Sequence, residues 1–216
     1  MRIGKQIIGT VAYMGGLPTL MEQFCWCWGQ LIQYNNEFVC GNNQIINYIK
    51  ASASFHTWAR NQLAESCLGD WLFMLDTDHS FDPDILGRLL NQMQIHNCDV
   101  ISAMYLTRHM PHVPVAYKWK GVGFSQIRRW ELDEGERLLP VDSVGCGTIL
   151  IRRHVFERVV DELMQRPFDV IHPWSEDHSF FRRLMRLGIK VYVDPKIESH
   201  HLLVKGLECS VDYQQT

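Results

Sequence analysis

The sequence predicts an α/β domain whose central sheet is mostly parallel and is flanked by helices. Strand and helix patterns alternate through the first half of the chain, which is typical of parallel sheets. Residues 71–76, "WLFMLD", form an unbroken apolar run, as expected for a central strand covered on both faces. Acidic residues follow this run directly, at the position where open α/β sheets bind ligands. With 216 residues, 46% of them hydrophobic, the chain has the size of a single domain.

The elements of the first half have local signals. An apolar run predicts the first strand over residues 5–13, and apolar residues at helical spacing then predict a helix from Leu20 to Ile32. Residues 37–41, "EFVCG", are a candidate second strand. The other elements predicted before residue 107 are a helix at 56–68, the central strand at 71–76, a helix at 83–93 and a strand at 99–106.

The second half departs from this alternation. Residues 107–124 mix prolines and glycines with histidines and aromatic residues, and predict a long lid or binding loop. Residues 128–141 predict a small β-hairpin excursion that turns near residues 133–135. The elements predicted after it are a strand at 148–153, a helix at 155–163, a helix that begins near Ser179 and ends at Gly188, and a strand at 190–194.

Composition excludes several classes of protein. A formal net charge of −3 gives no basic field for general binding of DNA or RNA. Seven cysteines, an odd number without C-x-x-C spacing, favour reduced thiols in a cytoplasmic protein over a zinc site. The first residues superficially resemble a signal peptide, but Gly15, Gly16 and Pro18 interrupt the apolar run and favour a strand. No run reaches the roughly 18 apolar residues of a membrane span.

The acidic residues after the central strand fall into two groups. Asp82 and Pro83 fit the N-cap and the first position of a helix, and Asp84 falls in its first turn, where a negative charge suits the helix dipole. Asp76 and Asp78 stand two apart, so in an extended segment both side chains point the same way. Crowded carboxylates repel each other unless a cation such as Mg²⁺ or Mn²⁺ neutralises them. The alternative is a pair of solvated turn residues, because D-x-D alone is a weak motif.

Three separated motifs give almost the whole chain a family resemblance. They are "ARNQLAESCLGDWLFMLDTDHSFDPDIL" at 59–86, "VGCGTILIRRHVFERV" at 144–159 and "WSEDHSFFRRLMRLGIKVYVDP" at 174–195. In order and separation they resemble the family 2 type of glycosyltransferases, which are sugar-nucleotide-dependent enzymes with an A-type Rossmann-like fold. The resemblance implies one glycosyltransferase domain over residues 1–216, with a nucleotide- and metal-binding half at 1–106 and an acceptor-side, catalytic half at 107–216.

The resemblance also implies a metal site and a nucleotide site. By position, Asp78 is the main ligand of Mn²⁺ or Mg²⁺, and Asp76 contacts the metal or the ribose, with Thr77 between them. The third ligand is a histidine of "SHH", where His201 is favoured over His200, and an ordinary exposed imidazole is the alternative. The residues implied to bind the donor nucleotide, besides these acids and Thr77, are Arg60, Ala12 and Tyr13.

Some of these matches are looser than others. "VAYMGG" departs from the family's usual Pro-Thr-Tyr-Asn type of run, so the identity of the nucleotide base stays open. For Arg60, a plain surface arginine is the alternative. The small-residue turn expected to border the donor sugar and the acceptor is Gly145, Cys146 and Gly147. Trp174 is expected to stack on a sugar face, and a packed loop tryptophan is the alternative.

Catalysis requires a base beside the acceptor hydroxyl. The resemblance assigns this role to Asp177, with Glu176 in reserve, whereas capping of the helix expected near Ser179 is the structural alternative. The hypothesis is a metal-dependent transferase that moves a sugar from a UDP- or GDP-sugar to a glycan or other hydroxyl acceptor, with inversion. The acceptor is then held by residues 107–124, by residues 174–180 or by a partner subunit of a homo-oligomer.

Two rival functions stay open. A nucleotidyltransferase shares the Rossmann-like core and an acid-bound metal, but it normally carries a glycine-rich, basic signature after the first strand. "MGGLPTLMEQ" at 14–23 has the glycines without Lys or Arg. The other rival is a sugar-nucleotide-binding module without catalysis, which would keep the same metal site.

Overall fold

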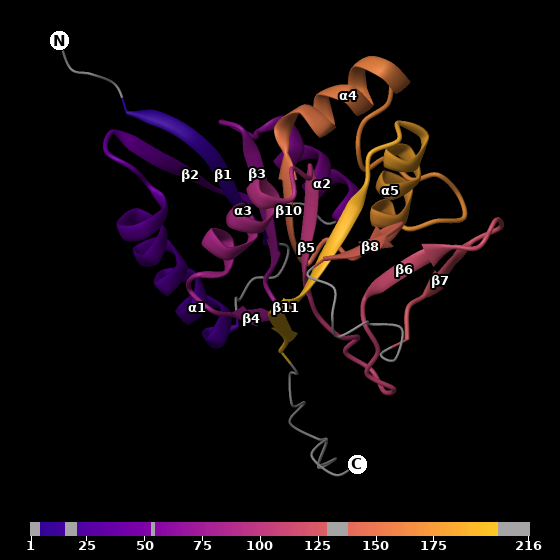
Figure 1. Cartoon of the computed structure of the whole chain (residues 1–216), viewed down its shortest axis with the longest axis horizontal. Helices are drawn as coiled ribbons and strands as arrows, with labels where there is room; N and C mark the ends of the chain where they lie inside the picture. The colour runs from indigo at the N-terminus through magenta and orange to yellow at the C-terminus, as the bar shows by residue number, and fades with distance from the viewer. Residues whose placement is uncertain (1–4, 16–20, 53–54, 129–137, 203–216) are drawn as a thin grey trace.

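The computed structural model describes residues 5–15, 21–52, 55–128 and 138–202 (Figure 1). The elements in chain order are β1 (Gln6–Met14), α1 (Glu22–Tyr34), the π-helix η1 (Asn35–Val39), β2 (Gln44–Ala51), α2 (His56–Glu65), β3 (Trp71–Asp76), β4 (His79–Phe81), α3 (Ile85–Ile95), β5 (Val100–Met104), β6 (Ala116–Trp119), β7 (Phe124–Gln126), β8 (Leu139–Val141), β9 (Ser143–Val144), β10 (Thr148–Arg152), α4 (Arg153–Leu163), α5 (Glu176–Arg186) and β11 (Val191–His201).

The main sheet has the strand order β2-β1-β3-β10-β5-β11-β4, and β8 also pairs with β11. Strands β2, β1 and β3 run parallel to one another, and β5 runs parallel to β11. The mostly parallel sheet predicted from the sequence is therefore confirmed. β10 lies antiparallel between β3 and β5, so it begins at the edge where those two strands end. Chain segments from both halves of the sequence meet at this edge.

Helices cover both faces of the sheet (Figure 1). One apolar cluster joins the sheet to α2, α4 and α5, and the other joins it to α1 and α3. β3 contributes to both, because Leu72 and Met74 face the first cluster while Phe73 and Leu75 face the second. Burial of both faces explains why "WLFMLD" is an unbroken apolar run. The central position of this strand, predicted from that run, is confirmed.

The β6–β7 hairpin stands beside the main sheet and pairs with β9 in a small second sheet (Figure 1). β6 falls inside the segment 107–124, where a long loop was predicted, so that prediction is wrong for β6, and β7 begins at the last residue of the segment. Lys120 N donates to Gly123 O at 2.8 Å and closes the turn. The predicted hairpin turn at 133–135 lies outside the described residues.

The prediction of a strand at residues 37–41 is wrong. Residues Asn35–Val39 instead extend α1 as a π-helix, and the second strand is β2. β2 is the edge strand of the main sheet and pairs with β1 alone, so most of its residues are only half-buried. Its mixture of isoleucines with Asn47 and Lys50 follows from this edge position.

Two helix starts also differ from expectation. α5 begins at Glu176 rather than near Ser179, because Ser175 caps it and accepts from His178 N at 3.4 Å. α3 begins at Ile85 with Asp84 at the N-cap, so the expectation that Asp82 caps this helix and Pro83 begins it is wrong. Gly188 has φ +69° after the end of α5, which confirms it as the residue that terminates this helix.

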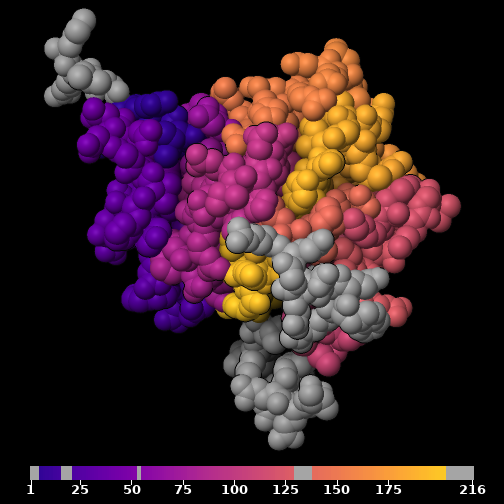
Figure 2. All heavy atoms as spheres, in the orientation of Figure 1, coloured from indigo at the N-terminus to yellow at the C-terminus, as the bar shows by residue number. Residues whose placement is uncertain are grey.

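In the space-filling view, α4 (orange) and α5 (yellow) lie side by side next to the hairpin (Figure 2). The six cysteines among the described residues are free thiols. Within the described part of the chain, no helix combines the length and apolar character needed to cross a membrane.

Candidate metal and sugar-nucleotide site

The candidate site lies at the sheet edge where β3 ends. Asp76 is the last residue of β3, Thr77 and Asp78 form a turn, and His79 begins β4. The expectation that Asp76 and Asp78 share one extended segment is wrong, because the turn separates them. Their carboxylates consequently meet different partners.

Asp78, His79 and His201 form a cluster that could hold a metal ion. Antiparallel pairing of β4 with β11 places His201 opposite His79, and their ring centroids are 4.3 Å apart. One potential ligand atom from each of the three residues lies within 4.8 Å of the others. The structure thus brings together two residues that the sequence assigned to the metal, Asp78 and His201, and adds His79.

His79 is oriented as a metal ligand would be. Its Nδ1 lies 3.1 Å from the Ser199 hydroxyl and 3.2 Å from the Thr148 hydroxyl. Its Nε2 is buried and has no hydrogen-bond partner among the described residues. Burial lowers the pKa of His79 to about 4, so the imidazole is neutral at pH 7. A neutral ring with one nitrogen anchored and the other unpartnered fits a cation.

His201 is held in the same way. Its Nδ1 lies 2.6 Å from the backbone carbonyl oxygen of Leu106, which can only accept, so Nδ1 carries the proton and Nε2 keeps its lone pair. Burial lowers the pKa of His201. Two imidazoles and one carboxylate form a mixed nitrogen and oxygen donor set, which suits a transition-metal ion better than Mg²⁺.

The other two candidate ligands lie outside this cluster. His200 is opposite Ser80 in the β4–β11 pair, so its side chain points to the opposite face of the strand from His201. It is exposed, and its Nε2 lies 3.9 Å from Glu198. Asp76 faces Arg60, at 3.5 Å, and its Oδ1 is buried without a hydrogen-bond partner among the described residues.

The Gly145–Gly147 turn packs directly against this cluster. A Cβ atom at Gly147 would lie 2.9 Å from His79 Nε2 and 3.1 Å from Asp76 Oδ2, and one at Gly145 would lie 2.1 Å from the Tyr105 hydroxyl oxygen. Gly147 N donates to that hydroxyl at 3.1 Å. The turn therefore needs glycine at both positions, and it places the predicted small-residue segment beside the candidate metal site.

Arg60 connects this turn to the acids on either side. Its guanidinium is buried and donates to the Cys146 carbonyl at 3.1 Å and to Glu176 at 3.2 Å, and it lies 3.5 Å from Asp76. Burial opposes its charge, but Asp76 and the other neighbouring acids raise the pKa of Arg60. The alternative of a plain surface arginine is wrong. Arg60 is buried, and three protein groups contact its guanidinium.

The Glu176 carboxylate contacts Arg60 at 3.2 Å and His56 at 3.6 Å. Burial alone would raise its pKa, but a hydrogen bond with His56 and the charge of Arg60 lower the pKa of Glu176 to about 2. A carboxylate with so low a pKa is a weak proton acceptor at neutral pH. Its contacts hold the carboxylate against Arg60 and His56.

Asp177 lies one residue further on, in the first turn of α5. Its Oδ1 accepts from His178 N at 2.8 Å and from the hydroxyl of Ser175. Both contacts use the same oxygen. Asp177 thus contacts the first turn of α5, in line with the alternative that an acid helps to cap this helix. Its side chain is half-buried.

Aromatic residues gather around the start of α5. The Trp174 ring packs edge-on against Trp119 at 5.9 Å and Phe124 at 5.7 Å, and Phe124 stacks on His178 at 4.6 Å. These contacts connect the β6–β7 hairpin to the segment that carries the two acids. Trp174 is half-buried, so it is a packed tryptophan that still presents some surface.

Ala12 and Tyr13, which were expected to bind the nucleotide base, have side chains that pack inside the protein. Ala12 is fully buried in the core, so its side chain is not available to a ligand. The ring of Tyr13 packs against Phe24 at 5.5 Å and Trp28 at 4.9 Å. Met14, which is opposite Asp76 in the β1–β3 pair, lies nearer to the candidate site.

Two residues of this site were missed in the sequence. His79 directly follows "DTD", so its position in "DTDH" was a usable signal once a ligand set was sought near Asp78. Arg108 forms an ion pair with Asp78 from the loop after β5. No local pattern identifies this arginine, because the contact depends on how the loop folds over the sheet edge.

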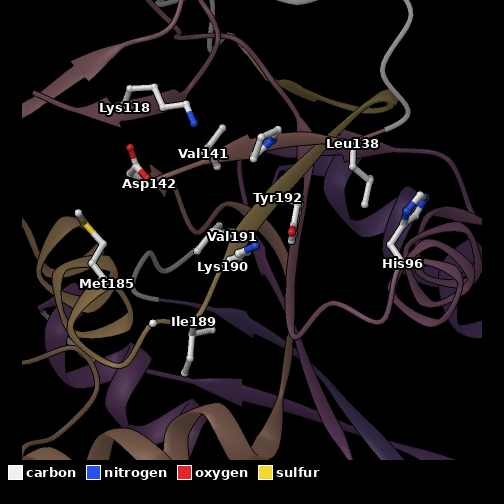
Figure 3. Close-up of a pocket in the computed structure, with 12 residues that line it drawn as sticks. His96, Lys118, Leu138, Val141, Asp142, Met185, Ile189, Lys190, Val191 and Tyr192 are labelled. Carbon is white, nitrogen blue, oxygen red and sulfur yellow. The ribbon is translucent and has the colours of Figure 1, made fainter.

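A separate cavity of about 800 Å³ lies at the opposite end of β11, where the strand begins (Figure 3). Its lining includes Lys118, Asp142, Lys190 and Tyr192. None of the residues assigned to the candidate site lines it. It is therefore distinct from the metal cluster.

Comparison with known proteins identifies the family of the chain. The sequence profile of the family described as Glycosyl transferase family 2 matches residues 31–160, more than half of the chain. The protein belongs to this family. The match includes Arg60, Asp76, Asp78 and the Gly145–Gly147 turn, and it ends before Asp177 and His201.

Solved structures show the same fold at low sequence identity. A197 from STIV aligns with a TM-score of 0.59 and 14% identity over 90% of this chain and 86% of A197. GalNAc-T7, solved with UDP, GalNAc and Mn²⁺, aligns with a TM-score of 0.60 and 12% identity over 91% of this chain and 43% of GalNAc-T7. Sequence comparison with curated proteins gives no match. The A-type glycosyltransferase fold predicted from the motifs is thus confirmed.

Proposed function

We propose that this member of family 2 is a metal-dependent glycosyltransferase that transfers a sugar from a nucleoside diphosphate sugar to an acceptor hydroxyl. The Asp78–His79–His201 cluster carries the proposal, because it offers a cation site at the sheet edge where this fold binds ligands. GalNAc-T7 has the same fold and was solved with UDP and Mn²⁺, which supports a UDP-sugar and Mn²⁺ as the first candidates. The mixed donor set of the cluster also favours Mn²⁺ over Mg²⁺.

The proposed site draws on both halves of the chain. Residues 1–106 supply Asp78 and His79, whereas residues 107–216 supply His201 and the two acids at the start of α5. A bound divalent cation would offset the negative charge that develops on the departing diphosphate. The Gly145–Gly147 turn lies directly beside His79, so it would border the donor in the proposed site.

In the proposed reaction, Asp177 accepts the proton of the acceptor hydroxyl. The acceptor oxygen forms a bond to the anomeric carbon as the bond from that carbon to the diphosphate oxygen breaks, which inverts the configuration. Glu176 keeps Arg60 in position and remains ionised. Trp174 and the hairpin residues around it offer an aromatic surface for a glycan acceptor.

Nucleotide binding gives the first test. We expect UDP or GDP, examined beside CMP and dTDP, to raise the melting temperature in the presence of Mn²⁺ and to have little effect without it. Asp78→Asn should abolish this stabilisation. Asp82→Asn is the matched control, because Asp82 is exposed and lies outside the cluster. If no nucleotide stabilises the wild type with Mn²⁺ or Mg²⁺, the donor assignment is wrong.

Activity needs a separate test. We expect slow hydrolysis of the preferred donor by the wild type, and loss of this activity in Asp177→Asn with unchanged nucleotide binding. Glu176→Gln should keep measurable turnover, since Glu176 positions rather than accepts a proton. Wild-type turnover in Asp177→Asn would exclude Asp177 as the base. Nucleotide binding without any turnover would instead support a binding module.

A further inference from the structure

Arg108 occupies the position of a counter-ion for Asp78. Its guanidinium forms an ion pair with the Asp78 carboxylate, and the side chains of Arg108 and Asp78 are 43% and 24% exposed. Asp78 is also the carboxylate of the Asp78–His79–His201 cluster. A guanidinium and a divalent cation on the same carboxylate repel each other. The ion pair of Arg108 with Asp78 therefore opposes binding of a cation at the cluster.

A cavity adjoining the cluster offers Arg108 another position. It measures about 430 Å³ and is lined by Arg108 together with His112, His200 and His201. Glu198 is the one acid among the described residues that line it. The guanidinium of Arg108 predicts that an anion is preferred there. Because His201 belongs to both the cluster and the cavity, such an anion would lie next to the cation.

The loop that carries Arg108 is fixed by its own hydrogen bonds. Thr107 N donates to Val113 O at 2.8 Å, and the Thr107 hydroxyl lies 3.1 Å from each of two acceptors, His109 O and Pro111 O. His112 Nδ1 lies 2.8 Å from Thr107 O. These contacts close the loop at the residue before Arg108. A change of side-chain rotamer can therefore move the guanidinium while the loop backbone stays in place.

We propose that Arg108 exchanges between Asp78 and the diphosphate of the donor as the divalent cation binds. The inference deepens the proposed function and rests on it. Without a nucleotide, Arg108 competes with the cation for Asp78. With a nucleoside diphosphate, Arg108 pairs with the phosphate oxygens while the cation takes Asp78, so each ligand favours binding of the other.

Substitution of Arg108 should change the two affinities in opposite directions. We expect Arg108→Gln to bind Mn²⁺ alone about threefold to tenfold more tightly than the wild type, because the competing charge is gone. The same variant should bind Mn²⁺–UDP and Mn²⁺–pyrophosphate about tenfold more weakly, because a charge-assisted contact is lost. Arg108→Lys should keep part of the diphosphate contact.

Isothermal titration with Mn²⁺ alone, and with UDP or pyrophosphate at saturating Mn²⁺, measures both affinities. Arg153→Gln is the matched control, because Arg153 has 47% side-chain exposure and pairs with Glu157 on α4. Melting temperatures show that each variant is folded. A merely structural role for Arg108 would lower both affinities or neither.

The outcomes separate this inference from the proposed function. If the wild type binds Mn²⁺ and UDP but Arg108→Gln changes both affinities in the same direction, or neither, the exchange is refuted and the donor site stands. If the wild type binds neither Mn²⁺ nor any nucleoside diphosphate, both proposals fail. Pyrophosphate isolates the diphosphate contact from the nucleoside, so weakening with UDP but not with pyrophosphate would also refute a phosphate contact of Arg108.

Discussion

Replacing Glu176 with glutamine tests the charge network around Arg60. The substitution keeps the shape of the side chain but removes the charge that faces the buried guanidinium at 3.2 Å. The ordinary pKa of 4.5 falls to about 2 in the folded protein. A shift of this size corresponds to about 3 kcal/mol of stability at pH 7. Water screens part of this interaction, since Glu176 retains 15% side-chain exposure, so we expect Glu176→Gln to lose about 2 kcal/mol.

The pH dependence identifies the source of this loss. Because folding lowers the pKa of Glu176, its contribution is complete above pH 4.5 and disappears as the pH falls through about 2. Urea unfolding of the wild type and of Glu176→Gln should therefore differ by about 2 kcal/mol at pH 7, and the difference should shrink between pH 4.5 and pH 2.

A second acid provides the control for this experiment. Glu157 pairs with Arg153 at 3.2 Å on the surface of α4, where the Glu157 side chain is 53% exposed. Glu157→Gln should change the free energy of unfolding by less than about 0.5 kcal/mol. Equal stability of Glu176→Gln and the wild type at pH 7, or a difference that stays constant down to pH 2, would contradict the assigned charge network.

Three further predictions concern the candidate site and the core. His79→Gln should weaken Mn²⁺ binding at least about tenfold in titration calorimetry, whereas His200→Gln should leave it unchanged; equal effects would place the metal elsewhere. Gly147→Ala should impair Mn²⁺ binding with little change in the circular dichroism spectrum, because the added Cβ meets His79 Nε2 at 2.9 Å, and normal binding would contradict this packing. Phe180→Ala should lower the free energy of unfolding by about 3–5 kcal/mol in urea, since Phe180 is fully buried and its ring lies 4.5 Å from that of Phe168; a loss below 1 kcal/mol would contradict its core position.

The parts of the fold that were predictable from the sequence are those whose burial is uniform. β3 is covered on both faces, so its apolar run stands out, and the stripe of Phe180, Phe181 and Leu184 on α5 follows helical spacing. β2 was missed because an edge strand alternates only weakly. β6 was missed because it is four residues long and lies among prolines and glycines.

The candidate site, like the fold, was only partly predictable from the sequence. Asp78 and Arg60 lie in a continuous motif, so the resemblance located both from order and spacing alone. The choice between His200 and His201 depended on strand register, which the β4–β11 pairing supplies. His79 and Arg108 required contacts between segments distant in sequence, namely β4 with β11 and the loop after β5 with Asp78. The sequence "DTDH" marks His79 as a neighbour of Asp78, but no local pattern shows that β4 pairs with β11 or that Arg108 reaches Asp78.

Arg60 connects the two ends of the proposed site, at the end of β3 and the start of α5. It contacts Asp76 next to the metal cluster, the carbonyl of the small-residue turn, and Glu176 beside the proposed base. A buried cation with acceptors on three segments is costly to displace, because each acceptor would lose its partner in a site of low dielectric. Arg60 therefore fixes the distance between the end of β3 and the start of α5. In the proposed reaction the donor phosphates lie at the first of these ends and the acceptor proton at the second, so Arg60 would keep the two groups in a fixed relation.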